Sequence, residues 1–161
     1  ELKGEAYFKV AKGRRFEVHT RLGKISVLGT QFNVKVRKNR FDVVCYEGRV
    51  KVNYANTQLL LTHGQSVSFE NGKQTNIKIL SLKPEWTENQ ICFYKEDIKS
   101  LLDEVERQYN ITIELNTKDT TSLFTGKLPA KNLDIALQII STTYHLEAKK
   151  VSKNKIIFDE K

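Results

Sequence analysis

The feature that most constrains how this chain folds is a period-two alternation of apolar and polar residues along its first third. Val, Ile, Phe and Tyr occupy the apolar positions, which is typical of half-buried β-strands, and short turn signals separate the stretches. Short strands at such close spacing predict an all-β unit of the sandwich or solenoid type. The alternating stretches are 4–11, 16–20, 24–29, 31–37, 41–48 and 49–54.

A Gly-Thr pair interrupts the alternation in the middle of "VLGTQFNV", residues 27–34. Gly29 allows a positive φ or the close approach of another backbone segment, so the strand can bend there. The hydroxyl of Thr30 can bond the loosened backbone, and Phe32 then returns to the inward phase. We therefore predict a structural role for these three residues instead of a binding role.

A hairpin is predicted further along, where Asn71-Gly72 stands between "SVSF" (66–69) and "QTNIKIL" (74–80). Asn-Gly is the dipeptide that two-residue hairpin turns prefer, because both positions need a positive φ.

The second half of the chain changes to a mixed pattern. Five apolar residues of 95–110 recur at helical spacing, with Asp97 as a candidate N-cap and Asn110 as a candidate end. A second helix is predicted within 129–145. The sequence therefore predicts a β-α-β-β-α-β-β module in which both helices pack on one face of a short sheet. Its predicted strands are 91–94, 111–115, 122–128, 146–151 and 155–159.

The chain is thus expected to be mainly β plus α+β, with an all-β domain at 1–84 and an α+β domain at 85–161. Trp86 would pack at the junction and fix the two halves relative to each other. The charge also divides there. Residues 1–84 hold 16 Lys and Arg against 6 Asp and Glu, a net +10, and residues 85–161 hold 11 against 13, a net −2.

The basic half keeps one alternative function open, a binding module for nucleic acid or an acidic glycan. Outward cations with interleaved aromatics can hold a single strand, and such binding weakens steeply with salt. However, Phe8, Phe32 and Phe41 share the inward phase of their strands. They therefore fit a core better than a stacking platform.

Catalytic and metal-binding patterns are missing. His19, His63 and His145 each stand alone, no serine lies in a GxSxG or SxxK motif, and no glycine-rich phosphate loop is present. The pair Asp103-Glu104 fits the solvated face of a helix. The sequence therefore predicts no enzyme, no cofactor and no metal site.

The two cysteines, Cys45 and Cys92, form no CxxC motif. Cys45 continues the inward alternation of its strand, which predicts a buried residue, and pairing in an oxidising compartment stays open. The chain has no apolar run long enough to span a bilayer and no methionine. We expect it to be a piece of a longer protein.

Four motifs in order resemble the periplasmic part of FecR-type transmembrane sensors. They are "GEAYFKV" at 4–10, "VLGTQFNV" at 27–34, "EGRV" with Gly48 at 47–50, and "HGQ" at 63–65. Residues 86–158 are similar to the C-terminal module of Bacteroidetes-type members, which resembles the short N-terminal domain of secretins and TonB-dependent transducers. Cys45 departs from the family pattern, which has an aliphatic residue there.

The resemblance implies an anti-sigma factor of cell-surface signalling in a Gram-negative bacterium. The periplasmic part would receive a signal from the periplasmic domain of a TonB-dependent outer-membrane transducer. An inner-membrane helix and a cytoplasmic segment upstream of residue 1 would then control an extracytoplasmic-function sigma factor. We expect no cofactor and no nucleic-acid partner.

Such a contact needs a free sheet edge, to which a partner strand can add through main-chain hydrogen bonds. We expect the edge to come from 122–128, with Phe124, Thr125 and Lys127, or from 146–151, with Glu147 and Lys149. Phe124 could equally be a core residue.

Overall fold

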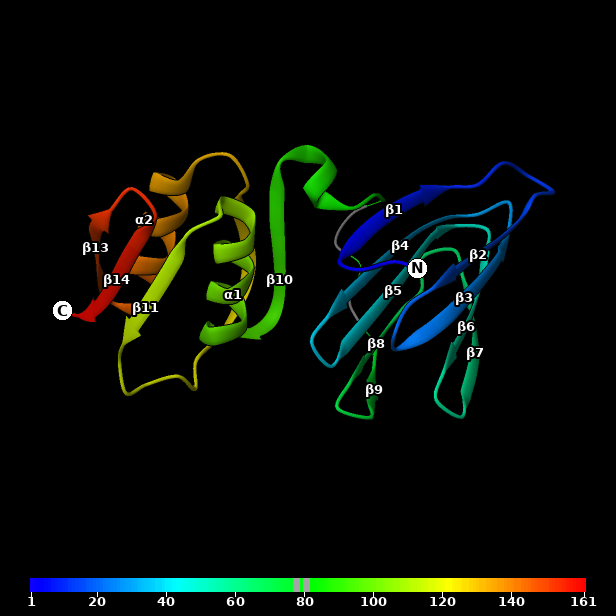
Figure 1. Cartoon of the computed structure of the whole chain (residues 1–161), viewed down its shortest axis with the longest axis horizontal. Helices are drawn as coiled ribbons and strands as arrows, with labels where there is room; N and C mark the ends of the chain where they lie inside the picture. The colour runs from blue at the N-terminus through cyan, green and yellow to red at the C-terminus, as the bar shows by residue number, and fades with distance from the viewer. Residues whose placement is uncertain (77–78, 80–81) are drawn as a thin grey trace. The chain divides into compact units, whose positions relative to one another are not determined.

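The computed structural model describes residues 1–76, 79 and 82–161. They divide into two units, Glu1–Pro84 and Glu85–Lys161, which we describe separately (Figure 1). Residues 77, 78 and 80 of the predicted strand "QTNIKIL" lie outside the described residues.

The described part of unit 1 folds into two antiparallel sheets (Figure 1). One sheet has the order β1-β4-β5-β8-β9 and the other has the order β2-β3-β6-β7. All six predicted strands are confirmed. The strands are β1 Glu5–Lys9, β2 Arg15–His19, β3 Gly23–Leu28, β4 Gln31–Arg37, β5 Arg40–Glu47, β6 Arg49–Tyr54, β7 Thr57–Thr62, β8 Ser66–Glu70 and β9 Lys73–Thr75.

The chain of unit 1 changes sheet after β1, β3, β5 and β7. It forms a hairpin within one sheet after β2, β4, β6 and β8. The turns of these hairpins gather at one end of the two sheets, and the crossovers gather at the opposite end (Figure 1). The predicted hairpin at Asn71-Gly72 is confirmed, since Glu70 pairs with Lys73 and the two turn residues have φ of 50° and 79°.

The space between the two sheets holds the core of unit 1. Alternate residues of the central strands are fully buried there, as the period-two pattern predicts. The inward phase predicted for β5 is confirmed, since Phe41, Val43 and Cys45 are all inaccessible to solvent. Phe32 is equally buried on β4 and stacks on Phe8 with 5.0 Å between the ring centroids.

Unit 2 has the predicted order of elements, preceded by a short 3₁₀ helix at Glu85–Glu88. Asp97 caps the first helix as predicted, because its side chain accepts a hydrogen bond of 2.9 Å from the amide of Ser100. Asn110 ends this helix with φ of 53°. The elements are β10 Gln90–Asp97, α1 Ile98–Tyr109, β11 Thr112–Asn116, β12 Leu123–Pro129, α2 Leu133–Tyr144, β13 Leu146–Ser152 and β14 Lys155–Glu160.

The prediction of one short sheet in unit 2 is wrong. The described strands form two sheets, β10-β12 and β11-β14-β13, with β11 and β14 parallel. Each sheet has one apolar face, and the helices lie between these two faces (Figure 1). The loop between β11 and β12 carries the chain from one sheet to the other, so these two consecutive strands do not pair.

Candidate functional site

Strand β12 has one hydrogen-bonded neighbour, β10, among the described strands. The amide of Ala130 donates to the carbonyl of Asn89 over 2.8 Å, so the backbone of Ala130 faces β10. Backbone direction alternates along an antiparallel strand. The backbone groups of Leu128, Gly126 and Phe124 therefore face β10, and those of Thr125 and Lys127 face away.

Pro129 belongs to the outward-facing set of β12. Proline has no amide to donate, and within sheets it occurs at positions where the amide would face away from the ladder. Beyond Pro129 this edge is covered, because its carbonyl accepts a hydrogen bond of 2.5 Å from the hydroxyl of Tyr109. The open part of the edge is thus Leu123–Lys127.

Thr125 and Lys127, two of the residues predicted at this edge, both have exposed side chains. The hydroxyl of Thr125 accepts a hydrogen bond of 2.9 Å from the amide of Lys95, which lies in a β-bulge of β10 with φ of 51°. Thr125 therefore satisfies the amide that the bulge displaces, while its own amide points away from β10.

Phe124, the third predicted residue of β12, lies in the core of unit 2 with 7% of its surface exposed. Its ring meets the ring of Phe93 edge-on at 5.7 Å. A Cβ at Gly126 would lie 3.0 Å from Cζ of Phe124, so the ring lies over the glycine. Sequence reasoning missed Gly126, although an aromatic residue two positions before a glycine on one strand is a signal for such a contact.

The second predicted edge, β13, pairs only with β14 among the described strands. Glu147 and Lys149 are both exposed, and their charges are paired within the sheet. Nζ of Lys149 lies 3.4 Å from the carboxylate of Glu147 and 3.0 Å from that of Asp159. These contacts raise the pKa of Lys149, chiefly through the hydrogen bond with Asp159.

The crossovers of unit 1 hold the other predicted motif. Gly29 has φ of +63°, and a Cβ there would lie 2.5 Å from Cα of Lys12 in the preceding crossover. Gly48, with φ of +85°, leaves no room for a Cβ, which would lie 2.9 Å from Oγ1 of Thr30. The hydroxyl of Thr30, almost fully buried, donates to the carbonyl of Arg49 over 2.9 Å.

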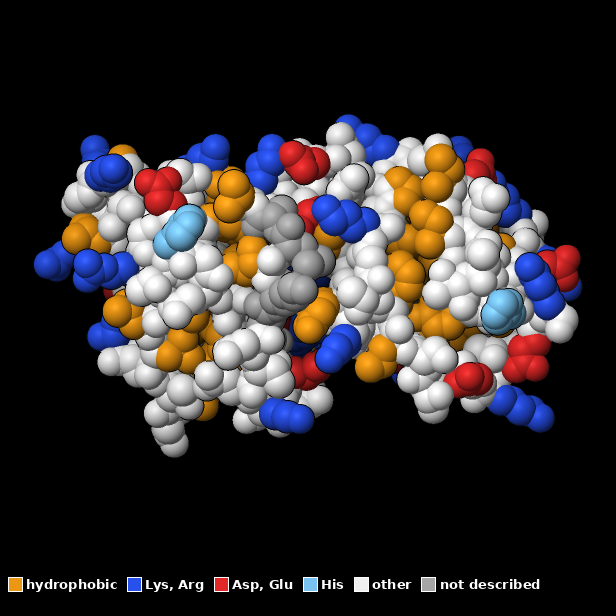
Figure 2. All heavy atoms as spheres, turned by 180° about the vertical axis from the view of Figure 1, so that it is seen from behind, with side chains coloured by type: hydrophobic (Ala, Val, Ile, Leu, Met, Phe, Trp, Pro, Cys, Tyr) orange, Lys and Arg blue, Asp and Glu red, His pale blue; other side chains and the backbone are white. Residues whose placement is uncertain are grey.

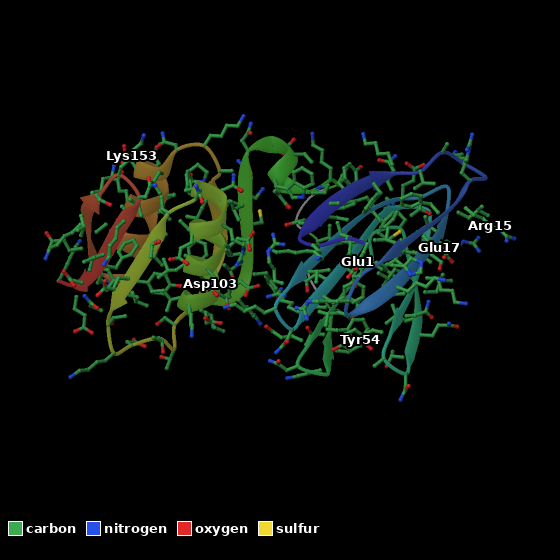
Figure 3. All side chains as sticks on the ribbon, viewed as in Figure 1. Glu1, Arg15, Glu17, Tyr54, Asp103 and Lys153 are labelled. Atoms are coloured by element: carbon green, nitrogen blue, oxygen red, sulfur yellow. The ribbon has the colours of Figure 1, made fainter. Side chains whose placement is uncertain are left out.

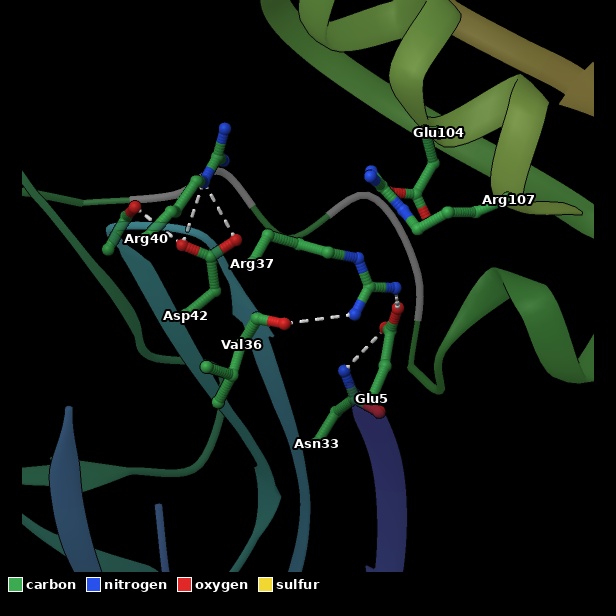
Figure 4. Close-up of polar contacts among 9 residues, drawn as sticks. Glu5, Asn33, Val36, Arg37, Arg40, Asp42, Glu104 and Arg107 are labelled. Atoms are coloured by element: carbon green, nitrogen blue, oxygen red, sulfur yellow. Dashed lines mark hydrogen bonds and ion pairs between the residues drawn. The ribbon is translucent and has the colours of Figure 1, made fainter. Parts of the chain in front are cut away.

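Two clusters of buried and half-buried polar side chains lie in unit 1 (Figure 4). Nε of Arg40 donates to both oxygens of Asp42, at 3.0 and 2.9 Å. Glu5 accepts from Asn33 over 2.9 Å and from Arg37 over 3.3 Å (Figure 4). Each carboxylate is therefore held by a guanidinium, an arrangement that fits a structural role.

The remaining candidate groups are dispersed. No group of three or more potential metal ligands occurs within the described ranges. Cys45 and Cys92 are both free thiols. Cys45 is buried as predicted, and its burial raises the pKa of the thiol to about 11, so it stays protonated at neutral pH. Trp86 lies on the 3₁₀ helix with 43% of its surface exposed.

Of the three aromatics considered beside the basic charge of unit 1, Phe8 is half-buried and packs against Phe16, which is 38% exposed. Phe32 and Phe41 are fully buried in the core. On the face seen in Figure 2, the Lys and Arg side chains lie in several small groups among white and orange groups.

Comparison with known families follows the same two-part division. Residues 2–51 match the family model of the FecR protein, and residues 90–158 match that of the FecR C-terminal region. The chain belongs to the FecR family. FecR proteins form a regulatory, non-enzymatic family of membrane-anchored sensors with periplasmic domains. No helix among the described residues of this FecR chain is long and apolar enough to cross a membrane.

The same fold occurs in a candidate anti-sigma factor from Parabacteroides distasonis ATCC 8503, with crystal structures at 1.65 and 2.50 Å resolution. Each superposes with a TM-score of 0.85 at 24% sequence identity, over 99% of this FecR chain and 78% of that one. No curated protein sequence matches this chain significantly.

Proposed function

We propose that this chain is the periplasmic part of an inner-membrane anti-sigma factor. It would receive a signal from a TonB-dependent outer-membrane transducer and control an extracytoplasmic-function sigma factor. The observation that carries the proposal is the order of the family matches, with the FecR region on unit 1 and the FecR C-terminal region on unit 2. The proposal includes no catalytic step, no cofactor and no nucleic acid.

The open edge of β12 is our proposed contact with the transducer domain. Its outward amides at Thr125 and Lys127 are the donors that an added strand needs. Both side chains are exposed, and Lys127 can meet a carboxylate of the partner. Phe124 would support this contact indirectly, because its packing against Phe93 holds β12 on the core.

The edge of β13 is the second candidate for this contact. Its side chains Glu147 and Lys149 are already engaged with each other and with Asp159. A partner that binds through these charges would first have to break their ion pairs within the sheet. We therefore favour β12.

Calorimetric titration of the chain with the periplasmic signalling domain of the transducer encoded beside it tests the proposal. The expected result is saturable 1:1 binding in the low micromolar range or tighter. Thr125→Pro should then weaken binding at least tenfold, because it removes an outward donor while the ladder to β10 is kept.

Thr125→Val is the matched control for this experiment. It also loses the hydroxyl that accepts from Lys95, but it keeps the outward amide. Its affinity should stay close to that of the unmodified chain. Equal affinities of all three proteins would contradict the β12 contact, and an absence of binding by the unmodified chain would contradict the transducer proposal itself.

A further inference from the structure

Strand β7 of unit 1 differs from every other edge strand that the structure describes. The sheets of the two units end at β1, β9, β2, β7, β10, β12, β11 and β13. All of these except β7 contain at least one charged residue, such as Arg15 and Glu17 on β2 (Figure 3). Charged residues on edge strands prevent unwanted pairing, so an uncharged edge marks a place where pairing is tolerated or used.

The sequence of β7 is "TQLLLT", without charge, proline or glycine. Leu60 is 55% exposed on the outer face of the sheet, while Leu61 is buried in the core. The strand is therefore anchored from within and open along its free side. At the opposite edge of the same sheet, β2 is partly covered, because the amide of Leu2 donates to the carbonyl of His19 over 2.7 Å.

The backbone of β7 offers a set of hydrogen-bonding groups with no partner strand among the described residues. Oε1 of Gln65 accepts from the amide of Thr62 over 2.9 Å, which identifies that amide as one that faces away from β6. By alternation, the amides and carbonyls of Leu60 and Gln58 face the same way. They are two donors and two acceptors in line, the pattern that an added strand requires.

The charge beside this edge is positive. On the neighbouring strand β6, Lys51 lies opposite Leu60 and Arg49 lies opposite Thr62. Both have exposed side chains on the outer face, and no ion pair joins either of them to a described residue. An added strand would lie about two strand spacings, roughly 10 Å, from β6, within reach of an extended Lys or Arg side chain and a carboxylate.

From these observations we infer that the free edge of β7 is a docking site for an extended, acidic polypeptide segment. The segment would pair with Gln58 and Leu60 through its main chain and direct its carboxylates toward Lys51 and Arg49. The net charge of +10 on residues 1–84 also favours an acidic partner over a second copy of the chain. This site lies on unit 1 and is independent of the β12 contact proposed above.

The test uses the full chain and two short synthetic peptides with blocked ends, one of alternating Glu and Val and one of alternating Lys and Val. Binding is followed by amide chemical shifts and by amide hydrogen exchange. The Glu peptide should bind at least tenfold more tightly at about 50 mM salt, and the preference should shrink at about 500 mM salt. The amides of Gln58 and Leu60 should become protected in the unmodified protein.

Leu60→Pro removes one outward amide without removing a bond to β6, so it should abolish binding of the Glu peptide. Leu60→Ala keeps that amide and should change the affinity less than threefold. Lys51→Glu should reverse the preference between the two peptides.

Three peptide-binding results would overturn the proposal. They are equal affinity for both peptides, unchanged binding by Leu60→Pro, and no protection of Gln58 and Leu60. A dimer in sedimentation equilibrium that Leu60→Pro abolishes would reassign the edge to pairing between copies and also overturn it.

Discussion

Replacement of Gly29 by alanine should destabilise unit 1 far more than the same replacement at Gly64. Both residues have a positive φ, +63° and +79°, and each lies in a crossover. Alanine in the left-handed region costs about 1–2 kcal/mol, and the loss of chain entropy in the unfolded state returns about 0.4–1 kcal/mol in both variants. These contributions are shared, so they cancel in the comparison.

The surroundings separate the two positions. A Cβ at Gly64 has no heavy atom within 4 Å, whereas a Cβ at Gly29 would lie 2.5 Å from Cα of Lys12, 3.0 Å from N of Gly13 and 3.2 Å from O of Ala11. These are backbone atoms and cannot rotate away. Overpacking of this kind costs about 1–3 kcal/mol. We expect Gly29→Ala to lower the free energy of unfolding by about 2–4 kcal/mol and Gly64→Ala by about 1 kcal/mol.

Amide hydrogen exchange at Val34 and Val43, both fully buried, measures this free energy for unit 1 alone. Exchange at buried amides of unit 2 serves as the internal reference and should not change. If the two variants differ by less than about 0.5 kcal/mol, within the scatter usual for independent sites, the close approach of the two crossovers is not what requires a glycine at position 29.

Two further predictions concern individual side chains. Partial burial raises the pKa of Asp97, but hydrogen bonds from Ser100 and from the amides of Lys99 and Asp97 together outweigh it and lower the pKa overall. The stabilisation by the cap is fully present above the unfolded pKa of aspartate and is lost as the pH falls from there through the lowered folded pKa. In urea unfolding, acidification from pH 5 to 3 should therefore destabilise the unmodified unit 2 more than it destabilises Asp97→Asn, and parallel curves would contradict this. Cys45, with a pKa raised to about 11 by burial, should resist alkylation at pH 8 in the native chain and react once urea unfolds unit 1; mass spectrometry of the labelled peptide decides, and labelling at equal rates would contradict it.

Local signals predicted much of the fold. Helix α1 was predictable from its apolar face and from its two ends, Asp97 and Asn110, because capping depends on neighbours within a turn. Strand β7 was not predicted, since three consecutive leucines give no alternation. The parallel pairing of β11 with β14 joins segments about 40 residues apart, and no local pattern encodes such a pairing.

The candidate edges were predictable only in part. Exposed Thr125 and Lys127 follow from the alternation of β12, but the direction of their amides depends on the register with β10 and on its bulge. The sequence predicted that position 29 needs a glycine for a close backbone approach or a positive φ. The identity of the approaching segment, Lys12 and Gly13, required the fold.

Two short crossovers hold the two sheets of unit 1 together at one end. Gly29-Thr30 and Gly48 join the two sheets through one or two residues each, and these corners are interlocked by the bond from Thr30 to Arg49. The other two crossovers, residues 10–14 and 63–65, are longer, whereas the hairpin turns at the far end, such as Ala55-Asn56, connect strands of the same sheet. A pulling force transmitted along the chain would therefore separate the two sheets first at the end formed by the hairpin turns. The end held by the hydrogen bond from Thr30 to Arg49 would separate after it, because the two shortest crossovers lie there.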